Sequence, residues 1–104
     1  MEVVNVSVVG HKYRKQYNYF DMVRATEYKI EPEPENKYDS NALACYYKQN
    51  YGYHKWIHFG YVPRRENQDE RLLNMLKKNH YMEYRRYNYN KYVNNVLFFK
   101  LVEG

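Results

Sequence analysis

The sequence predicts a mainly β fold with one principal helix, arranged as a small, curved, mostly antiparallel barrel. Short segments alternate apolar and polar residues or are apolar throughout, and Gly, Pro or Asn residues separate them. One stretch has clear helical periodicity. Many short strands around one helix favour a barrel, because a single hairpin sheet would leave its edges exposed. The 104 residues have the length of one domain, which we assign to residues 1–104.

The first strand is indicated by three valines that alternate with polar residues from Val4 to Val8, before Gly10. Residues 11–16 are polar and basic, which is typical of a loop. Residues 20–30 are predicted to be extended, with Met22 on one face of the segment.

Residues 31–35 contain two prolines, which lack a backbone donor. This segment is therefore predicted to be extended at the surface rather than part of a helix or a central strand. Residues 36–41 then form a turn. Two strands that are apolar on both faces follow at residues 41–48 and 56–62, with a hairpin turn at residues 50–53.

Residues 66–79 are the one clear helix. Three leucines form an apolar stripe, acidic residues lie near the start and two lysines lie near the end, as the helix dipole favours. Residues 81–89 and 93–102 are predicted to be two further strands, joined through an Asn- and Lys-rich hairpin turn.

Charge and composition favour an acidic partner. Seventeen Lys and Arg against 12 Asp and Glu give a net charge of +5, and nucleic acid is the commonest acidic partner. The chain is rich in tyrosine, with 15 residues, and bases stack well on tyrosine rings. Tyrosine is also a good strand residue, and an abundance of Tyr, Asn and Lys is equally typical of an AT-rich genome.

The sequence indicates a reducing compartment and no membrane partner. The single cysteine, Cys45, precludes an intrachain disulfide, and its apolar neighbours favour a buried side chain over a catalytic thiol. No apolar run approaches the ~18 residues needed to span a bilayer, and the N-terminus lacks the features of a signal peptide. We therefore expect a cytoplasmic location.

No pattern in the sequence argues for an enzyme. His54 and His58 lie in a strand-like run, which places them about 13 Å apart, and no third metal ligand is near them. The acidic residues of segment 31–39 are splayed by prolines, so a solvated acidic loop is a simpler interpretation than the metal site of a nuclease. No nucleotide-binding or nucleophile-elbow motif is present. We predict no catalytic residue, no metal site and no cofactor.

Three clusters interleave cations with aromatic rings. Single-stranded nucleic acid exploits this pattern by placing phosphates on cations and bases on rings. Each cluster alone is typical of a solvated face, but all three lie at or near the ends of predicted strands. The clusters are Lys12, Tyr13, Arg14, Lys15 and Tyr17; Tyr61, Arg64 and Arg65; and Tyr84, Arg85, Arg86 and Tyr87.

Two motifs resemble the HIRAN domain. The first is residues 36–44, NKYDSNALA, and the second, which is shorter, is Phe59–Pro63. Val8–Gly10 also fits the first strand of that family, so the resemblance covers nearly the whole chain in the right order. It implies an OB-like β-barrel that binds the 3′-hydroxyl end of single-stranded DNA. Such domains occur at the front of SWI/SNF-type translocases and as small standalone proteins of bacteria and phages.

The resemblance also implies a pocket for the terminal nucleotide. Tyr38 would stack on the terminal base, and Asp39 would accept a hydrogen bond from the terminal 3′-hydroxyl. The other implied contributors are Tyr13 as the opposite wall, Asn36 and Lys12 as its support, and Tyr61 and Arg64 beside the phosphates.

An acidic turn within a basic surface would allow the domain to distinguish a free 3′-hydroxyl from a phosphate. A carboxylate repels a phosphate but accepts a hydrogen bond from a hydroxyl, so Asp39 would supply selectivity and the cations affinity. Alternatively, Asp39 and Asn41 tie the turn through Asx-type hydrogen bonds. The chain departs from the family at Lys37, where proline is usual, so the turn lacks the fixed φ of that ring.

We therefore predict a non-enzymatic module that recognises 3′-hydroxyl ends of single-stranded DNA. The alternative on the same fold is a protein-interaction module. This would be a phage-type factor that docks, through exposed tyrosines, on a nucleic-acid-processing enzyme of its host. Its location would then be the host cell.

Overall fold

The computed structural model describes residues 1–85 and 96–104, and the elements below are those of this part of the chain. None of its helices is long and apolar enough to cross a membrane. In chain order the elements are β1 (Val3–Val9), the 3-10 helix η1 (His11–Tyr13), α1 (Tyr19–Arg24), β2 (Tyr28–Pro32), β3 (Leu43–Lys48), β4 (Trp56–Tyr61), α2 (Glu70–Leu76), β5 (His80–Tyr84) and β6 (Val96–Glu103).

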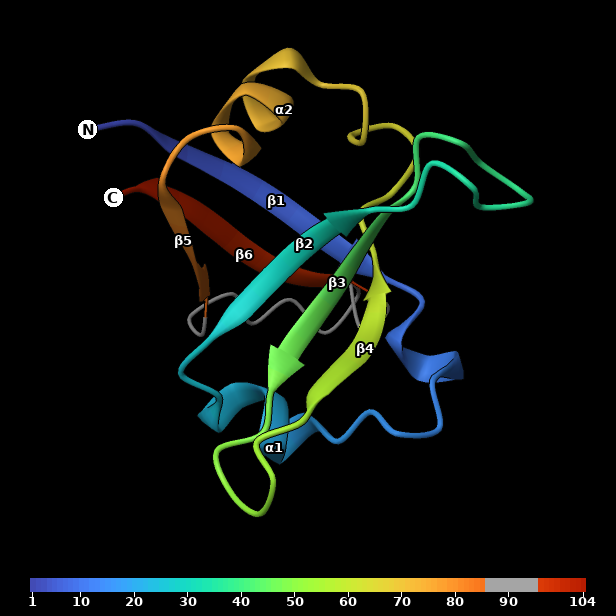
Figure 1. Ribbon diagram of the computed structural model, residues 1–104, viewed down its shortest axis with the longest axis vertical. Helices are drawn as coiled ribbons and strands as arrows, with labels where there is room; N and C mark the ends of the chain where they lie inside the picture. Colours follow the sequence, from blue (N-terminus) through green and yellow to red (C-terminus); the bar gives the residue numbers. More distant parts are fainter. Residues whose placement is uncertain (86–95) are drawn as a thin grey trace.

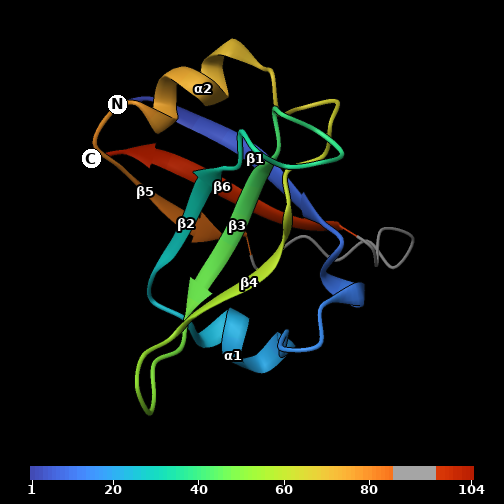
Figure 2. The same ribbon diagram turned by 45° about the vertical axis from the view of Figure 1, so that its right-hand side comes forward.

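The strands form one antiparallel sheet in the order β2-β3-β4-β1-β6-β5, which confirms the mainly β prediction. The sheet is strongly curved, so that β2 and β3 cross over β1 and β6 in Figure 1. Helices α1 and α2 lie at opposite ends of the sheet in both views (Figures 1 and 2). The predicted barrel is not closed, because the edge strands β2 and β5 do not pair with each other within the described residues.

Strand β1 joins the two halves of the sheet. It pairs with β6 along its whole length but with β4 only where Val9 lies opposite Tyr61. Away from that pair, the edge of β1 that faces β4 is contacted by the segment before α2. There the backbone N–H of Ser7 donates to Oε1 of Glu66 at 3.0 Å. The sheet therefore divides at Val9, and the candidate site lies at this division.

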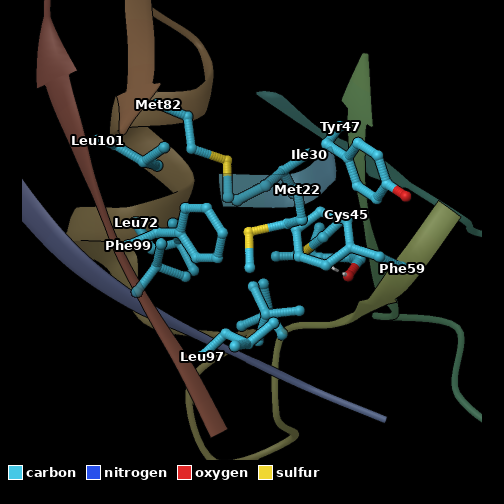
Figure 3. Packing of buried hydrophobic residues seen from close by; sticks show 14 of the residues in the cluster. Met22, Ile30, Cys45, Tyr47, Phe59, Leu72, Met82, Leu97, Phe99 and Leu101 are labelled. Atoms are coloured by element: carbon cyan, nitrogen blue, oxygen red, sulfur yellow. Dashed lines mark hydrogen bonds between the residues drawn. The ribbon is translucent and has the colours of Figure 1, made fainter. Parts of the chain in front are cut away.

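The core fills the space inside the curve. Alternate residues of the strands point inward, so the period of two in the sequence becomes the period of burial. Figure 3 shows Met22 of α1 between Phe59 of β4 and Phe99 of β6, and all three side chains are fully buried. The inner faces of the strands are buried in the core, so binding must use the outer faces and the loops.

The prediction for residues 20–30 is wrong in its first half, because residues 19–24 form the helix α1. Asn18 caps this helix, and its Oδ1 accepts from the backbone N–H of Asp21 at 3.1 Å. Six residues are too few to show a helical period, and Met22 alone carries the packing by pointing into the core. The second half is extended, as predicted, and forms most of β2.

The predicted helix at residues 66–79 is present but shorter, over Glu70–Leu76. Asp69 is its N-cap, with Oδ1 accepting from the backbone N–H groups of Arg71 and Leu72. Residues 66–69 instead form turns, in which the N–H groups of Glu66 and Asn67 both donate to the carbonyl of Pro63. This turn segment carries Asn67, whose side chain contacts Asp39 at the candidate site.

The remaining strand predictions are confirmed with shifted ends. Strand β2 ends at Pro32 on the edge of the sheet, where the missing backbone donor costs no ladder hydrogen bond. Strands β5 and β6 pair from His80↔Glu103 to Tyr84↔Phe99. The hairpin turn predicted between them, with the strand ends beside it, lies outside the described residues.

Candidate functional site

A pocket of about 420 Å³ opens where the sheet divides. Three segments build its walls: the end of β1 with the chain after η1, the turn that precedes β3, and the end of β4. The lining residues are Val9, Arg14, Asn36, Tyr38, Asp39, Ala42, Tyr61, Val62, Pro63 and Arg64.

Gly60 sets the close approach of two of these walls. A Cβ atom at this position would lie 2.4 Å from the carbonyl oxygen of Val9 and 2.7 Å from Cγ1 of Val8. Such distances are far shorter than a van der Waals contact, so only glycine allows β4 to pass this close to β1. The adjacent Tyr61 is thereby placed directly opposite Val9.

Asn36 organises the turn that forms the acidic wall. Its Oδ1 accepts from the backbone N–H of Tyr38 at 2.9 Å and from that of Asp39 at 3.1 Å. Its Nδ2 donates to Oε1 of Glu33 at 3.0 Å. These bonds fix the turn around Lys37, which lacks the fixed φ of a proline ring.

Asp39 presents an ionised carboxylate to the pocket. Its Oδ1 accepts from the backbone N–H of Asn41 at 2.9 Å, and its Oδ2 accepts from Nδ2 of Asn67 at 2.9 Å. These two bonds, and the charge of Arg64 with Nε 3.6 Å from Oδ2, hold the pKa of Asp39 below its usual value. The turn-tying role considered for Asp39 is thus real. A carboxylate offers about four acceptor positions, so capacity for a ligand hydroxyl remains.

Tyr38 is an exposed ring on a fixed backbone. The residue is 86% exposed to solvent. Its N–H is bound to Asn36, and its carbonyl accepts from Nη2 of Arg64 at 2.7 Å. A platform whose backbone is held and whose ring faces solvent loses little freedom when a flat ligand stacks on it.

Two separate sets of hydrogen bonds hold the opposite wall, one at Tyr61 and one at Arg14. The hydroxyl of Tyr61 donates to Oε1 of Glu33 at 2.9 Å. Nε2 of His58 lies 2.9 Å from the carbonyl of Gly60, to which it donates, so Nδ1 is the free acceptor and receives a hydrogen bond from Nη2 of Arg14. Burial, and then the charge of Arg14, lower the pKa of His58, so its ring is neutral at pH 7.

The structure brings together five of the seven residues that the sequence indicated. Asn36, Tyr38, Asp39, Tyr61 and Arg64 all line the pocket. Lys12 and Tyr13 do not line it; they lie on η1, two residues and one residue before the lining residue Arg14, and Tyr13 is 89% exposed.

Sequence reasoning missed three contributors, which are Arg14, His58 and Asn67. Arg14 was visible only as one member of a basic cluster. Its contact with His58 joins residues 44 apart in the chain, and the contact of Asn67 with Asp39 joins residues 28 apart. No local pattern signals such pairs.

Two further observations concern residues considered for chemistry in the described part of the chain. No group of three or more His, Cys, Asp or Glu side chains converges there as a metal-binding cluster. Cys45 is fully buried, and burial raises the pKa of its thiol, which keeps it in the unreactive protonated form.

A small antiparallel sheet with an exposed ring, an ionised carboxylate and two arginines around an open pocket defines a binding module. A model of the HIRAN domain family matches residues 1–102, and the chain belongs to this family. HIRAN domains bind nucleic acid, and they are binding rather than catalytic domains.

One solved structure supports the fold. It is the crystal structure of a protein from Lactobacillus plantarum, determined as a structural genomics target, which is similar to this chain with a TM-score of 0.55 and 21% sequence identity. The match covers 99% of this chain and 98% of that one. No curated protein matches the sequence.

Proposed function

We propose that this HIRAN domain binds single-stranded DNA at the pocket and recognises a free 3′-hydroxyl end, without catalysing a reaction on it. One observation supports this most directly. The exposed ring of Tyr38 and the ionised carboxylate of Asp39 are neighbours in the same pocket, and Arg14 and Arg64 flank them.

The two central residues divide the work of recognition. Tyr38 stacks on the terminal base, which is sequence-tolerant because every base has a π-face. Asp39 accepts a hydrogen bond from the terminal hydroxyl and repels a phosphate in the same position. An end with a free hydroxyl is therefore separated from a 3′-phosphate and from an uninterrupted strand.

The remaining residues supply affinity and support. Arg14 and Arg64 attract the phosphates, while Asn36 holds the backbone that carries Tyr38 and Asp39. Tyr61 closes the far wall with its ring. Further phosphate and base contacts come from Lys12 and Tyr13, which η1 exposes beside Arg14. The protein would act in the cytoplasm, where DNA ends are accessible.

The decisive experiment compares two oligonucleotides of one sequence, with a 3′-hydroxyl or a 3′-phosphate, by fluorescence anisotropy. The wild type should prefer the hydroxyl end by on the order of tenfold or more, the worth of one charge-assisted hydrogen bond. Asp39→Asn keeps the size of the side chain but removes its charge, and should bring the ratio close to one. Circular dichroism must show that the variant is folded. A wild type without preference would overturn end recognition.

A second candidate function, docking on a protein, rests on a different surface. Tyr19 and Phe20 of α1 are 50% and 65% exposed, and Tyr53 at the β3–β4 turn is 91% exposed. Exposed aromatic rings are typical anchors of protein interfaces. A partner enzyme captured from nuclease-treated host lysate by the wild type, but not by Phe20→Ser, would favour this function.

A further inference from the structure

Four aromatic side chains form a row on the outer face of β3 and β4. The ring centroids of Tyr61 and His58 are 4.8 Å apart, and those of His58 and Tyr46 are 5.0 Å apart. Trp56 follows at the beginning of β4, linked to Tyr46 by Lys29, whose Nζ lies 4.4 Å and 5.3 Å from the two ring centroids. We call these four residues the aromatic row. One end of it, Tyr61, lines the pocket.

The row lies outside the hydrophobic core. None of its four residues belongs to the buried core, which takes the opposite faces of the same strands through Tyr47 and Phe59. The outer face of an antiparallel strand is ordinarily polar. Here it carries rings, and the exposed fraction of Trp56 is 36%.

Two lysines accompany the rings. Besides the contacts of Lys29, Nζ of Lys48 lies 5.6 Å from the ring centroid of Trp56. Both lysines form ion pairs, Lys29 with Glu31 at 2.8 Å and Lys48 with Glu27 at 3.3 Å. Both carboxylates are more than half exposed, and exposed ion pairs contribute little free energy. A phosphate can therefore take the place of either carboxylate beside its lysine.

The length of the row suits a strand that leaves the pocket. The five residue steps from Trp56 to Tyr61 span roughly 16 Å at the rise of a β-strand. Stacking rings with interspersed cations are what a single strand requires of a surface, with bases on the rings and phosphates on the cations. Because the row begins at the pocket wall, a strand whose end occupies the pocket reaches it without a gap.

We propose that the nucleotides preceding the 3′-terminal one run along the aromatic row, with bases on Tyr46 and Trp56 and phosphates near Lys29 and Lys48. This inference deepens the proposed function and rests on it. The domain then reads a stretch of single strand as well as its end, and its affinity increases with the length of that stretch.

Trp56 provides the test, because it is the single tryptophan of the chain and lies at the far end of the row. An oligothymidine of about eight nucleotides, within the usual site size of such folds, should quench its selectively excited fluorescence. A dinucleotide should not. Tyr46→Ala should weaken binding of the long oligonucleotide by roughly 5- to 100-fold, from the loss of one stacking contact. Tyr81→Ala, at an exposed ring of β5, is the matched control and should leave that affinity unchanged.

Charge gives an independent measurement. Glu31→Gln removes the carboxylate that competes for Lys29, so it should strengthen binding of the long oligonucleotide and leave the preference for a 3′-hydroxyl over a 3′-phosphate intact. If anisotropy shows tight binding of the long oligonucleotide while Trp56 is not quenched and Tyr46→Ala binds normally, the row is not the path and the pocket proposal stands. If neither oligonucleotide binds, the proposed function is wrong, and the row proposal falls with it.

Discussion

Asn67, which is only 2% exposed, donates its side-chain amide to Oδ2 of Asp39 at 2.9 Å. This bond ties the turn before α2 to the turn before β3, and so joins two walls of the pocket. The Oδ1 atom of the same amide is buried without a hydrogen-bond partner within the described residues. Among the described residues, the bond to Asp39 is therefore the one hydrogen bond of this buried side chain, and it fixes one oxygen of the carboxylate.

Asn67→Ala should raise the pKa of Asp39 and lower the stability of the protein. The pKa rises because a hydrogen bond to the charged form is lost. The free energy of unfolding should fall by about 1 kcal/mol, the typical net contribution of one intramolecular hydrogen bond. Carbon-13 NMR titration of the carboxyl and urea unfolding measure the two effects. Asn74→Ala, at an exposed position of α2, is the control and should change stability by about 0.5 kcal/mol at most.

Acidification should destabilise the fold through His58. Its pKa in the folded state is lowered, chiefly by burial and then by Arg14, so the unfolded chain binds the proton more readily. The contribution of the neutral ring is thus present above the unfolded pKa of about 6.5 and is lost as pH falls through the lower folded pKa. Urea unfolding between these values should show stability rising with pH. Glu33, Arg14, Tyr46 and Tyr61 face this ring, and the lowered pKa of Glu33 acts at more acidic pH.

His58→Gln should flatten this slope, because glutamine does not titrate. An unchanged slope in the folded variant would show that another group carries the pH dependence.

Tyr38→Ala should weaken binding of every single-stranded oligonucleotide by about 1–3 kcal/mol, whatever the terminal base, because it removes a stacking platform. The ring is so exposed that the variant should keep the wild-type thermal midpoint. Anisotropy with four oligonucleotides that differ in their last base measures the effect. A loss confined to one base would point to base-specific recognition instead of stacking.

Binding should weaken as salt increases. If about three phosphates are neutralised, by Arg14, Arg64 and one lysine, the logarithm of the affinity should fall against the logarithm of salt concentration with a slope near −2, at roughly 0.7 per contact. Arg64→Gln should make the slope less steep by roughly 0.7, the contribution of one phosphate contact. A slope of zero would exclude phosphate contacts and would favour the protein-docking surface on α1.

Gly60→Ala should be among the most damaging small substitutions in the chain. The added methyl group would meet the backbone of Val9, which cannot turn aside as a side chain can. Overpacking of this kind costs about 1–3 kcal/mol, and here it would also separate β4 from β1 at the pocket. Thermal unfolding should show the loss. Ala44→Gly, on the neighbouring strand, removes a methyl group instead of adding one, so it serves for comparison as a change of the same size without a clash.

The sequence predicted those parts of the fold in which local pattern and burial coincide. The alternating valines predicted β1 and the leucine stripe predicted α2, and both elements are present. Helix α1 was missed because it is short and held by a single buried side chain, Met22, which packs against residues far away in the chain. The curvature that leaves the sheet open between β2 and β5 has no local signal either.

The candidate site divides in the same way. Residues of one contiguous motif, such as Asn36, Tyr38 and Asp39, were identified together because the motif carries them. Arg14 and Asn67 reach the pocket only through tertiary contacts, so nothing beside them in the sequence distinguishes them from surface residues. The effect of Lys37 could not be judged in advance, because the hydrogen bonds by which Asn36 holds the turn exist only in the folded chain.

The pairing of β1 with β6 also governs the order in which the protein can fold. Strand β1 lies in the middle of the sheet, yet its full-length partner is the last strand of the chain. On a ribosome that adds about 5–20 residues per second, β1 must wait for nearly the whole chain before that partner emerges. Pairing across so long a loop is entropically slow, and sheets dominated by such contacts fold in milliseconds to seconds. During synthesis, the valines of β1 are exposed to chaperones or to other nascent chains until β6 has emerged, and the pocket, which depends on Val9, is completed only then.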